Sequence, residues 1–293
     1  MNLRDLEYLV ALAETRHFGR AAERCHVSQP TLSTQLRKLE EYLGVALVER
    51  QPRRVALTTA GEAVVARARH MLRDADDIRS LARASQDPLS GTLKVGLIPT
   101  LGPYLLPRVA PKFAKALPKL SLLLHEYQTA PLVERTLAGE LDLAILALPA
   151  ETRGLATRPL FDEPFLVAMP ERHRLAAKKR VKASDLEGEK LLLLEEGHCL
   201  RDQALEVCAH VGTEEQAFRA TSLETLRQMV ASGLGLTLLP GLSAGGPFAS
   251  ARGLTVRPFA PPTPHRVIGA AWRRSSSRLD AIDVVCDIVA RAG

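Results

Sequence analysis

The first 60 residues place apolar side chains at helical spacing in short, separate stretches. In the first stretch they recur three and four positions apart, which predicts a helix with one apolar stripe. The residues of this stripe are Leu6, Leu9, Val10 and Ala13. A second short helix is expected from Phe18 to about Cys25. Two short helices therefore precede residue 27.

A third helix is expected from about Gln29 to Leu43. Ser28 is a good N-cap, Pro30 fits the first turn, where its missing N–H costs little, and Gly44 ends the helix. The apolar face holds Leu32, Leu36, Leu39 and Leu43, and the opposite face holds Thr31, Thr34, Gln35 and Lys38. Two helices joined by a short turn, the second with a polar outer face, form the helix-turn-helix pattern.

A small hairpin with a basic tip follows, because two apolar pairs flank Arg50, Pro52, Arg53 and Arg54. Lysine and arginine contact phosphates, and a polar helix face can bond to base edges. A three-helix packing unit without a ligand is the alternative, and the basic hairpin favours DNA binding. The residues expected in the groove are Gln29, Pro30, Thr31, Ser33, Thr34, Gln35 and Lys38. Arg50, Arg53 and Arg54 are expected on the DNA backbone or in the minor groove.

One long helix is predicted over residues 59–87. Val64, Met71 and Ile78 are seven residues apart, with alanines between them, which gives a seam of about three heptads. The helix could pack on its own chain, but a helix this long favours a partner, so we expect it to dimerise. Residues 87–91 form a linker.

Beyond Thr92, short apolar runs alternate with helical stretches, which predicts an α/β fold with parallel strands. The expected strands are 93–98, 121–126, 142–146, 165–169, 190–194, 235–239 and 267–272, and the expected helices include 103–116 and 131–138. A span of about 200 residues indicates two sub-domains. The chain is expected to cross between them near Phe161 and to return near Arg266.

Overall composition and net charge say less about function than the positions of the basic and polar residues do. The chain has 46% hydrophobic and 25% charged residues, which excludes a largely disordered or collagen-like protein. A net charge of +6 permits an anionic partner without proving one. No apolar stretch is long enough to span a membrane, and Asp5 and Glu7 argue against a signal peptide, so a cytoplasmic protein is expected. Four cysteines are too few for a disulfide scaffold, and none has zinc-ligand spacing, so no structural metal is expected.

The N-terminal segment resembles the LysR-type transcriptional regulators. The residues that support the resemblance are Leu3–Leu6, Phe18 with Ala21 and Ala22, Ser28–Ser33, Leu39–Glu40, Arg50 with Leu57–Thr58, and Ala60–Gly61. It implies a winged helix-turn-helix domain over 1–58, a dimerising linker helix and hinge over 59–90, and a periplasmic-binding-protein-like effector domain over 91–293. Sub-domain I is then about 91–161 with 267–293, and sub-domain II about 162–266. The family further implies homotetramers built as dimers of dimers.

The run Gly197–Gln203, with Cys208 nine residues after Cys199, resembles the peroxide-sensing branch of that family. The resemblance implies that hydrogen peroxide oxidises Cys199 and that Cys208 resolves the sulfenic acid into a disulfide. It places Thr100, Thr129, His198 and Asp202 at the peroxide pocket and Arg266 near the thiol, with no cofactor. The alternative is that Cys199 is a small buried hydrophobe, the usual state of an unpaired cysteine.

The residues around Cys199 suit thiol chemistry independently of the resemblance. The thiolate is the nucleophile, and a helix N-terminus with His198 and Arg201 beside it favours that form. Threonine hydroxyls could hold a peroxide, and His198 or Asp202 could pass a proton to the departing oxygen. Cys25 and Cys286 are expected to serve packing.

A helix over residues 199–208 could not coexist with the disulfide. Nine residues at about 1.5 Å each separate its ends by roughly 13 Å. A disulfide requires Cα atoms within about 7 Å. Oxidation must therefore unwind or remodel this segment, which supplies a two-state element for a switch.

The sequence thus predicts a peroxide-sensing transcription regulator that binds double-stranded promoter DNA, acts with RNA polymerase and is reset by a cellular thiol reductant. A LysR-type regulator of a small organic effector, with incidental cysteines, is the alternative. A peroxide-reducing enzyme would not need residues 1–58, and a solute-binding protein is disfavoured for the same reason.

Overall fold

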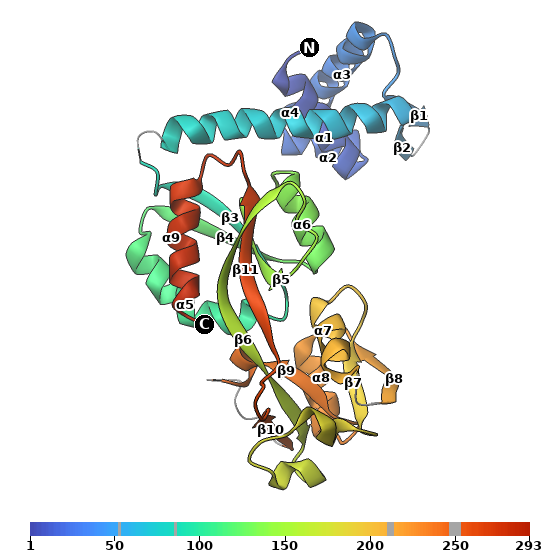
Figure 1. Ribbon diagram of the computed structural model, residues 1–293. Coiled ribbons are helices and arrows are strands. Elements are labelled where there is room, and N and C mark those ends of the chain that lie inside the picture. Colours follow the sequence, from blue (N-terminus) through green and yellow to red (C-terminus); the bar gives the residue numbers. More distant parts are fainter. Residues whose placement is uncertain (52–53, 85–86, 210–213, 246–252) are drawn as a thin grey trace. The chain divides into compact units, whose positions relative to one another are not determined.

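The computed structural model describes the chain except for residues 52–53, 85–86, 210–213 and 246–252. It divides into two compact units, residues 1–82 and 83–293. The first unit contains α1 (Leu3–Thr15), α2 (Phe18–Arg24), α3 (Gln29–Leu43), the hairpin β1 (Val48–Gln51) and β2 (Arg54–Leu57), and α4 (Thr59–Ala84), which continues to the boundary (Figure 1). The three predicted short helices and the hairpin are all present.

Local capping sets the limits of the helices in the first unit. Asn2 and Asp5 form a reciprocal capping box at the start of α1. Ser28 Oγ accepts the backbone N–H of Thr31 at the start of α3, and Gly44 ends α3 with φ +67°. The shared core comes from all three helices and includes Leu9, Leu12, Leu32, Leu36 and Leu39.

The hairpin is attached to α3 by a side chain rather than by packing alone. Glu40 Oε1 accepts the backbone N–H groups of Leu47 at 2.8 Å and Val48 at 3.1 Å. Thr58 Oγ1 donates to the carbonyl of Ala46 and accepts the N–H of Gly61 at 2.9 Å, which joins the end of the hairpin to the start of α4. The strand that leads to the basic tip is therefore fixed to the helix with the polar face.

The long helix is confirmed, with α4 ending at Ala84. Ala68 is buried in the first unit, whereas Met71 and Ile78 are 45% and 66% exposed. Arg69 reaches Glu14 on α1 at 3.6 Å. The N-terminal part of α4 is thus packed on its own unit, and the apolar residues of its later turns remain exposed in the single chain.

The second unit is built on one mixed sheet. Among the described residues its strands follow the order β10-β6-β11-β5-β3-β4, with β9 pairing with β6. The bounds are β3 (Gly91–Leu97), β4 (Leu120–Glu126), β5 (Leu143–Leu148), β6 (Leu155–Pro170), β9 (Thr237–Pro240), β10 (Leu254–Pro258) and β11 (His265–Arg273). Figure 1 shows β6 and β11 side by side along both halves of this unit.

The prediction of parallel strands is right for only part of this sheet. β3 is parallel to β4 and β5, but β11 is antiparallel to both β5 and β6, and β9 and β10 are antiparallel to β6. The predicted strand 165–169 is only the end of the 16-residue β6. Because β6 passes from one half to the other and β11 returns beside it, the two strands must run in opposite directions.

Helices cover both halves of the second unit. In the half built on β3, β4 and β5, α5 (Gly102–Ala116) packs against α9 (Leu279–Ala290), and α6 (Thr129–Leu137) packs against β5 and β11. The other half contains η1 (Arg174–Ala177), η2 (Ala183–Leu186), the parallel pair β7 (Lys190–Leu194) and β8 (Glu214–Ala220), α7 (Cys199–Cys208), α8 (Leu223–Ala231) and η3 (Gly241–Ala244).

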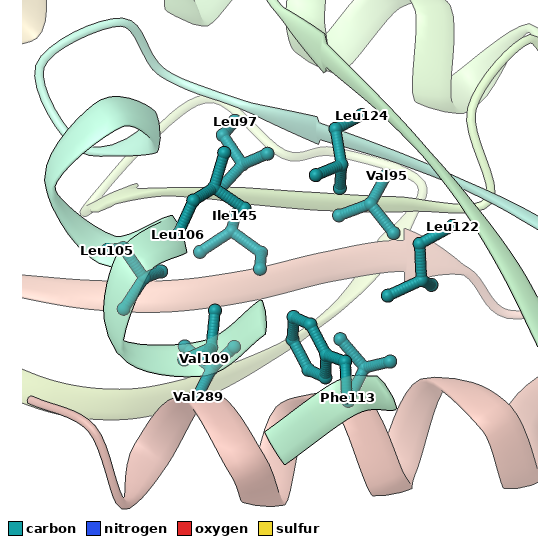
Figure 2. A pocket seen from close by; sticks show the side chains of 11 residues that line it. Val95, Leu97, Leu105, Leu106, Val109, Phe113, Leu122, Leu124, Ile145 and Val289 are labelled. Carbon is teal, nitrogen blue, oxygen red and sulfur yellow. The ribbon is translucent and has the colours of Figure 1, made fainter. Parts of the chain in front are cut away.

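A continuous apolar core lies under these helices. Figure 2 shows side chains of α5, α9 and strands β3, β4 and β5 around a cavity of about 10 Å³ lined by apolar residues, among them Leu97, Val109, Phe113 and Ile145. Within the described residues, no helix is both long and apolar enough to cross a membrane.

Candidate functional site

The two cysteines of interest lie at opposite ends of one helix. Cys199 is the first residue of α7 and Cys208 is the last, and His198 is the N-cap. Cys199 is half-buried and Cys208 is 3% exposed, and both are thiols. The helix predicted from the sequence is therefore present in the reduced chain, and it holds the two sulfur atoms apart.

Cys199 opens onto a cleft of about 710 Å³ between the two halves of the second unit. One wall is α7, which contributes Cys199, Asp202, Gln203, Glu206 and Val207. The opposite wall includes Leu148 and Pro149 after β5 and the segment from Pro262 to Val267. The structure thus brings the predicted residues Asp202 and Arg266 to the same cleft as the thiol.

Arg266 is the most highly connected residue of this cleft, and its side chain is fully buried. Its Nη1 donates to Thr100 Oγ1 at 2.9 Å, and its Nη2 donates to the Thr100 carbonyl at 3.1 Å. Its Nε donates to Glu163 Oε2 at 2.9 Å, and Nη2 lies 2.8 Å from the same oxygen. Two predicted site residues, Thr100 and Arg266, are therefore in direct contact.

Glu163 is a site residue that the sequence did not reveal. It lies on β6 directly opposite Arg266 on β11, so the two side chains share one face of the sheet. The first half of β6 was not predicted as a strand, and Glu163 is 103 residues from its partner. Only the pairing register of β6 with β11 identifies Glu163 as the partner of Arg266, and a single sequence does not give that register.

Two further polar atoms bear on the site, and one of them belongs to Gln203 in the cleft wall. Among the described residues, Thr129 Oγ1 and Gln203 Oε1 are buried and have no hydrogen-bond partner. Thr129 begins α6 next to Gln128, whose side-chain amide lies against Gly197. Because Gly197 comes two residues before Cys199, this contact connects the start of α6 to the segment that precedes the thiol.

His198 is buried and is not among the residues that line the cleft. It is 5% exposed, and its imidazole forms a hydrogen bond with the backbone of Thr221. Burial lowers the pKa of His198, and the Glu195 carboxylate and the bond to Thr221 oppose that effect. A neutral imidazole is therefore favoured at pH 7. The cleft lining contains none of Thr100, Thr129 and His198, although Thr100 is bonded to the lining residue Arg266. Arg201 lies on α7 with its backbone N–H bonded to the carbonyl of His198.

The seven residues predicted to enter the DNA groove all lie in α3. Gln29, Pro30, Thr31, Thr34 and Lys38 are exposed, and Ser33 and Gln35 are half-buried. The hydroxyls of Thr31 and Ser28 are hydrogen-bonded at 2.8 Å. Arg50 and Arg54 lie in β1 and β2, and Arg53 lies outside the described residues.

Comparison with known proteins places both units in one family. Residues 3–62 match the model for bacterial regulatory helix-turn-helix proteins of the lysR family, and residues 86–293 match the LysR substrate binding domain. The chain is 52% identical over 277 residues to the DNA-binding transcriptional dual regulator OxyR of Escherichia coli, an alignment that covers 94% of this chain and 90% of that protein.

Solved structures give the same result. A cysteine-to-aspartate variant of full-length OxyR from Pseudomonas aeruginosa superposes with a TM-score of 0.76 at 46% identity, covering 99% of this chain and 94% of that one. A cysteine mutant of Corynebacterium glutamicum OxyR with bound H₂O₂ gives a TM-score of 0.68 at 38% identity, covering 99% and 92%. This chain belongs to the LysR family of bacterial helix-turn-helix regulators, in the group of the OxyR hydrogen peroxide-inducible genes activators.

Proposed function

We propose that this protein is a transcription regulator that binds DNA and responds to hydrogen peroxide through Cys199. The observation that supports this most strongly is the position of Cys199 at the N-terminus of α7, on a cleft it shares with Asp202 and Arg266. The buried Thr100 hydroxyl, bonded to Arg266, adds a polar group suited to a small oxidant. The name of the E. coli relative and the peroxide bound in the C. glutamicum structure favour the same assignment.

The chemistry has two balanced steps. The Cys199 thiolate attacks one oxygen of H₂O₂, an S–O bond forms as the O–O bond breaks, and the departing hydroxide takes a proton to become water. The Cys208 thiolate then attacks the sulfenic sulfur, an S–S bond forms as the S–O bond breaks, and the departing hydroxide takes a proton to leave as a second water. A cellular dithiol returns two electrons and resets the pair.

The second step requires α7 to unfold. The ten residues Cys199–Cys208 are helical, so the ends of this segment are roughly 13 Å apart. A disulfide requires Cα atoms within about 7 Å. Leu200 and Ala204 are buried under α7 and must find new contacts when it unwinds. We expect this repacking to change how effector domains pair and how their DNA-binding domains are spaced.

The other parts follow from the same proposal. Residues 1–58 bind double-stranded promoter DNA through the outer face of α3 and the hairpin, and residues 59–90 join two copies. The exposed Met71 and Ile78 on α4 support this pairing. The effector domain, residues 91–293, would complete a tetramer and signal to RNA polymerase.

Mass spectrometry of the reduced full-length protein after one equivalent of H₂O₂ tests the proposal. We expect a Cys199–Cys208 link and loss of that link in Cys199→Ser. Cys286→Ser is the matched control, since Cys286 is buried in α9. Oxidation of Cys286 or Cys25 in place of Cys199, or identical promoter footprints of the reduced and oxidised protein, would contradict the proposal.

A small organic effector is the second candidate, because a cleft of about 710 Å³ is within the usual range for ligand pockets. In that case Cys199→Ser would keep the full transcriptional response to the effector and the oxidised cysteines would be incidental.

A further inference from the structure

The carboxylate of Glu163 joins Arg266, in the cleft wall, to the η3 turn. Its Oε2 accepts Nε of Arg266 at 2.9 Å, and its Oε1 accepts the backbone N–H of Leu242 at 2.8 Å. Glu163 is 2% exposed and the Arg266 side chain is not exposed at all. The positive charge nearest to Thr100 is therefore matched by a negative charge that is equally buried.

This pairing determines what Arg266 can do. A guanidinium whose charge is balanced by a contacting carboxylate contributes little net positive potential to a thiolate elsewhere in the cleft. It remains a rigid, planar donor, held by Glu163 along one edge and bonded to Thr100 along the other. Arg266 is thus better suited to orienting Thr100 than to serving as the counter-ion of Cys199.

The direction of the bond to Thr100 has a further consequence. A threonine hydroxyl has one hydrogen and two acceptor positions. Because Arg266 Nη1 can only donate, Thr100 Oγ1 is the acceptor of that bond. The hydroxyl hydrogen of Thr100 is therefore available to an acceptor other than Arg266, and an oxygen of bound peroxide is such an acceptor.

We infer that Glu163 is a positioning residue of the peroxide site, which neutralises Arg266 and fixes it so that the Thr100 hydroxyl donates to the bound oxidant. The same carboxylate ties this arrangement to the η3 turn through Leu242. η3 is held on its other side by Arg227, whose Nη1 donates to the carbonyl of Ser243 at 2.7 Å. The inference rests on the proposed reaction of Cys199 with peroxide.

Removing the charge of Glu163 should change two reactivities in opposite directions. In Glu163→Gln the buried guanidinium loses its counter-charge, which raises the positive potential in the cleft and favours the Cys199 thiolate. A single amide oxygen cannot serve both Arg266 and Leu242 as the carboxylate does, so Thr100 loses its fixed orientation. Alkylation of Cys199 by iodoacetamide should therefore rise, while its oxidation by peroxide should fall.

The experiment measures both rates on the reduced full-length protein at pH 7, with mass spectrometry to locate the modified cysteine. For Glu163→Gln we expect alkylation to rise about threefold and peroxide oxidation to fall about tenfold. The matched control is Asp162→Asn, because Asp162 is the exposed neighbour on β6 and its side chain points to the other face of the sheet. Both of its rates should equal those of the unmodified protein.

A second variant separates charge from folding. Glu163→Gln combined with Arg266→Gln replaces the ion pair by two neutral amides, so the potential at Cys199 should return to its original value. Alkylation should then match the unmodified protein, while peroxide oxidation stays slow because Thr100 has lost its donor. Thermal unfolding followed by circular dichroism verifies that each variant is folded, and the double variant serves where Glu163→Gln alone does not fold.

The inference fails if Glu163→Gln changes both rates by the same factor, since a structural role alone gives that result. It also fails if the double variant oxidises as fast as the unmodified protein. The proposed function fails separately if one equivalent of peroxide does not oxidise Cys199 in the unmodified protein, whatever Glu163 does.

Discussion

Tyr104 on α5 donates a hydrogen bond to Glu224 on α8 at 2.9 Å, and this bond joins the two halves of the effector unit. Tyr104 is 4% exposed, and burial, together with the Glu224 carboxylate, raises the pKa of its hydroxyl. Glu224 also lies 3.7 Å from Arg227, the residue that holds η3. The bond therefore belongs to a polar contact between the halves.

Tyr104→Phe removes this bond and keeps the packing of the ring. We expect the effector unit to lose about 1 kcal/mol of unfolding free energy in urea, because Glu224 Oε1 loses the hydroxyl donor and is only partly solvated. Tyr127→Phe is the control, since the ring of Tyr127 lies under Arg135 and that contact does not use the hydroxyl. Equal losses in the two variants would contradict the role of the Tyr104 bond.

The buried His198 should make stability depend on pH. Burial lowers the pKa of His198 below its ordinary value of 6.5, so the unfolded chain binds the proton more tightly than the folded one. Stability is then complete above pH 6.5 and decreases as the pH falls below it towards the folded-state pKa. Urea unfolding should show a smaller loss between pH 7 and pH 5 in His198→Gln than in the unmodified protein. An identical loss in both would exclude His198 as the source.

Gly197 should not tolerate a side chain. Its φ is +93°, and a Cβ there would lie 2.5 Å from Gln128 Oε1. We expect Gly197→Ala to destabilise the effector unit by about 1–3 kcal/mol and to displace the segment before Cys199. Gly188→Ala separates the two causes, because Gly188 has a similar positive φ of +69° but no neighbour within 4 Å. Combining Gly197→Ala with Gln128→Ala should restore the part of the unfolding free energy that is lost to the contact between the new Cβ and Gln128. If nothing is restored, the whole loss comes from the positive φ of the backbone.

Where the determinants are local, the sequence predicted the structure closely. The limits of α3 follow from Ser28, Pro30 and Gly44, all within two residues of the helix ends, and the structure has the helix at the predicted residues. The strands of the second unit were placed from short apolar runs, and β7 begins and ends as expected. Each of these predictions depends only on residues that are close together in the sequence.

The remainder depends on contacts between distant residues. The first ten residues of β6 mix apolar and charged positions and contain Pro159 and Pro164, so no local pattern marks them as a strand, and they are extended because β11 pairs with them. The antiparallel part of the sheet was missed for this reason. The family resemblance supplied Thr100 and Arg266 as site residues. The bonds of Arg266 to Thr100, 166 residues away, and to Glu163, 103 residues away, depend on the tertiary fold.

Glu40 should support DNA binding without touching DNA. Its carboxylate holds the first residues of the hairpin, Leu47 and Val48, to α3. Glu40→Ala leaves these two N–H groups without that acceptor and should destabilise the first unit by about 1–3 kcal/mol. Affinity for promoter DNA should fall, because the basic hairpin is no longer fixed beside the polar face of α3.

The direction of this effect makes the test clear. Removing an acidic residue from a DNA-binding unit strengthens general phosphate attraction, so charge alone predicts tighter binding. Glu41→Ala, at the exposed neighbouring position of α3, carries that charge change without the hydrogen bonds. Fluorescence anisotropy with promoter DNA should show weaker binding for Glu40→Ala and equal or tighter binding for Glu41→Ala. Tighter binding in both variants would show that the hydrogen bonds from Glu40 to the hairpin do not support DNA binding.

Helix α7 should limit the second redox step. Glu206 is exposed and lies two residues before Cys208 on α7, where glycine costs about 1 kcal/mol more than alanine. Glu206→Gly and Glu206→Ala remove the same carboxylate from the cleft and differ only in how readily the helix unwinds. The unwound population should be about fivefold larger in the glycine variant.

Rapid-quench mass spectrometry can follow the sulfenic acid on Cys199 and the disulfide separately. Formation of the sulfenic acid should be equally fast in the two variants, because α7 is still helical when peroxide reacts. Conversion to the disulfide with Cys208 should be about fivefold faster in Glu206→Gly than in Glu206→Ala, in proportion to the unwound population. Equal conversion rates would show that unwinding of α7 does not control disulfide formation, and a faster first step in the glycine variant would mean that peroxide reacts with an already unwound segment.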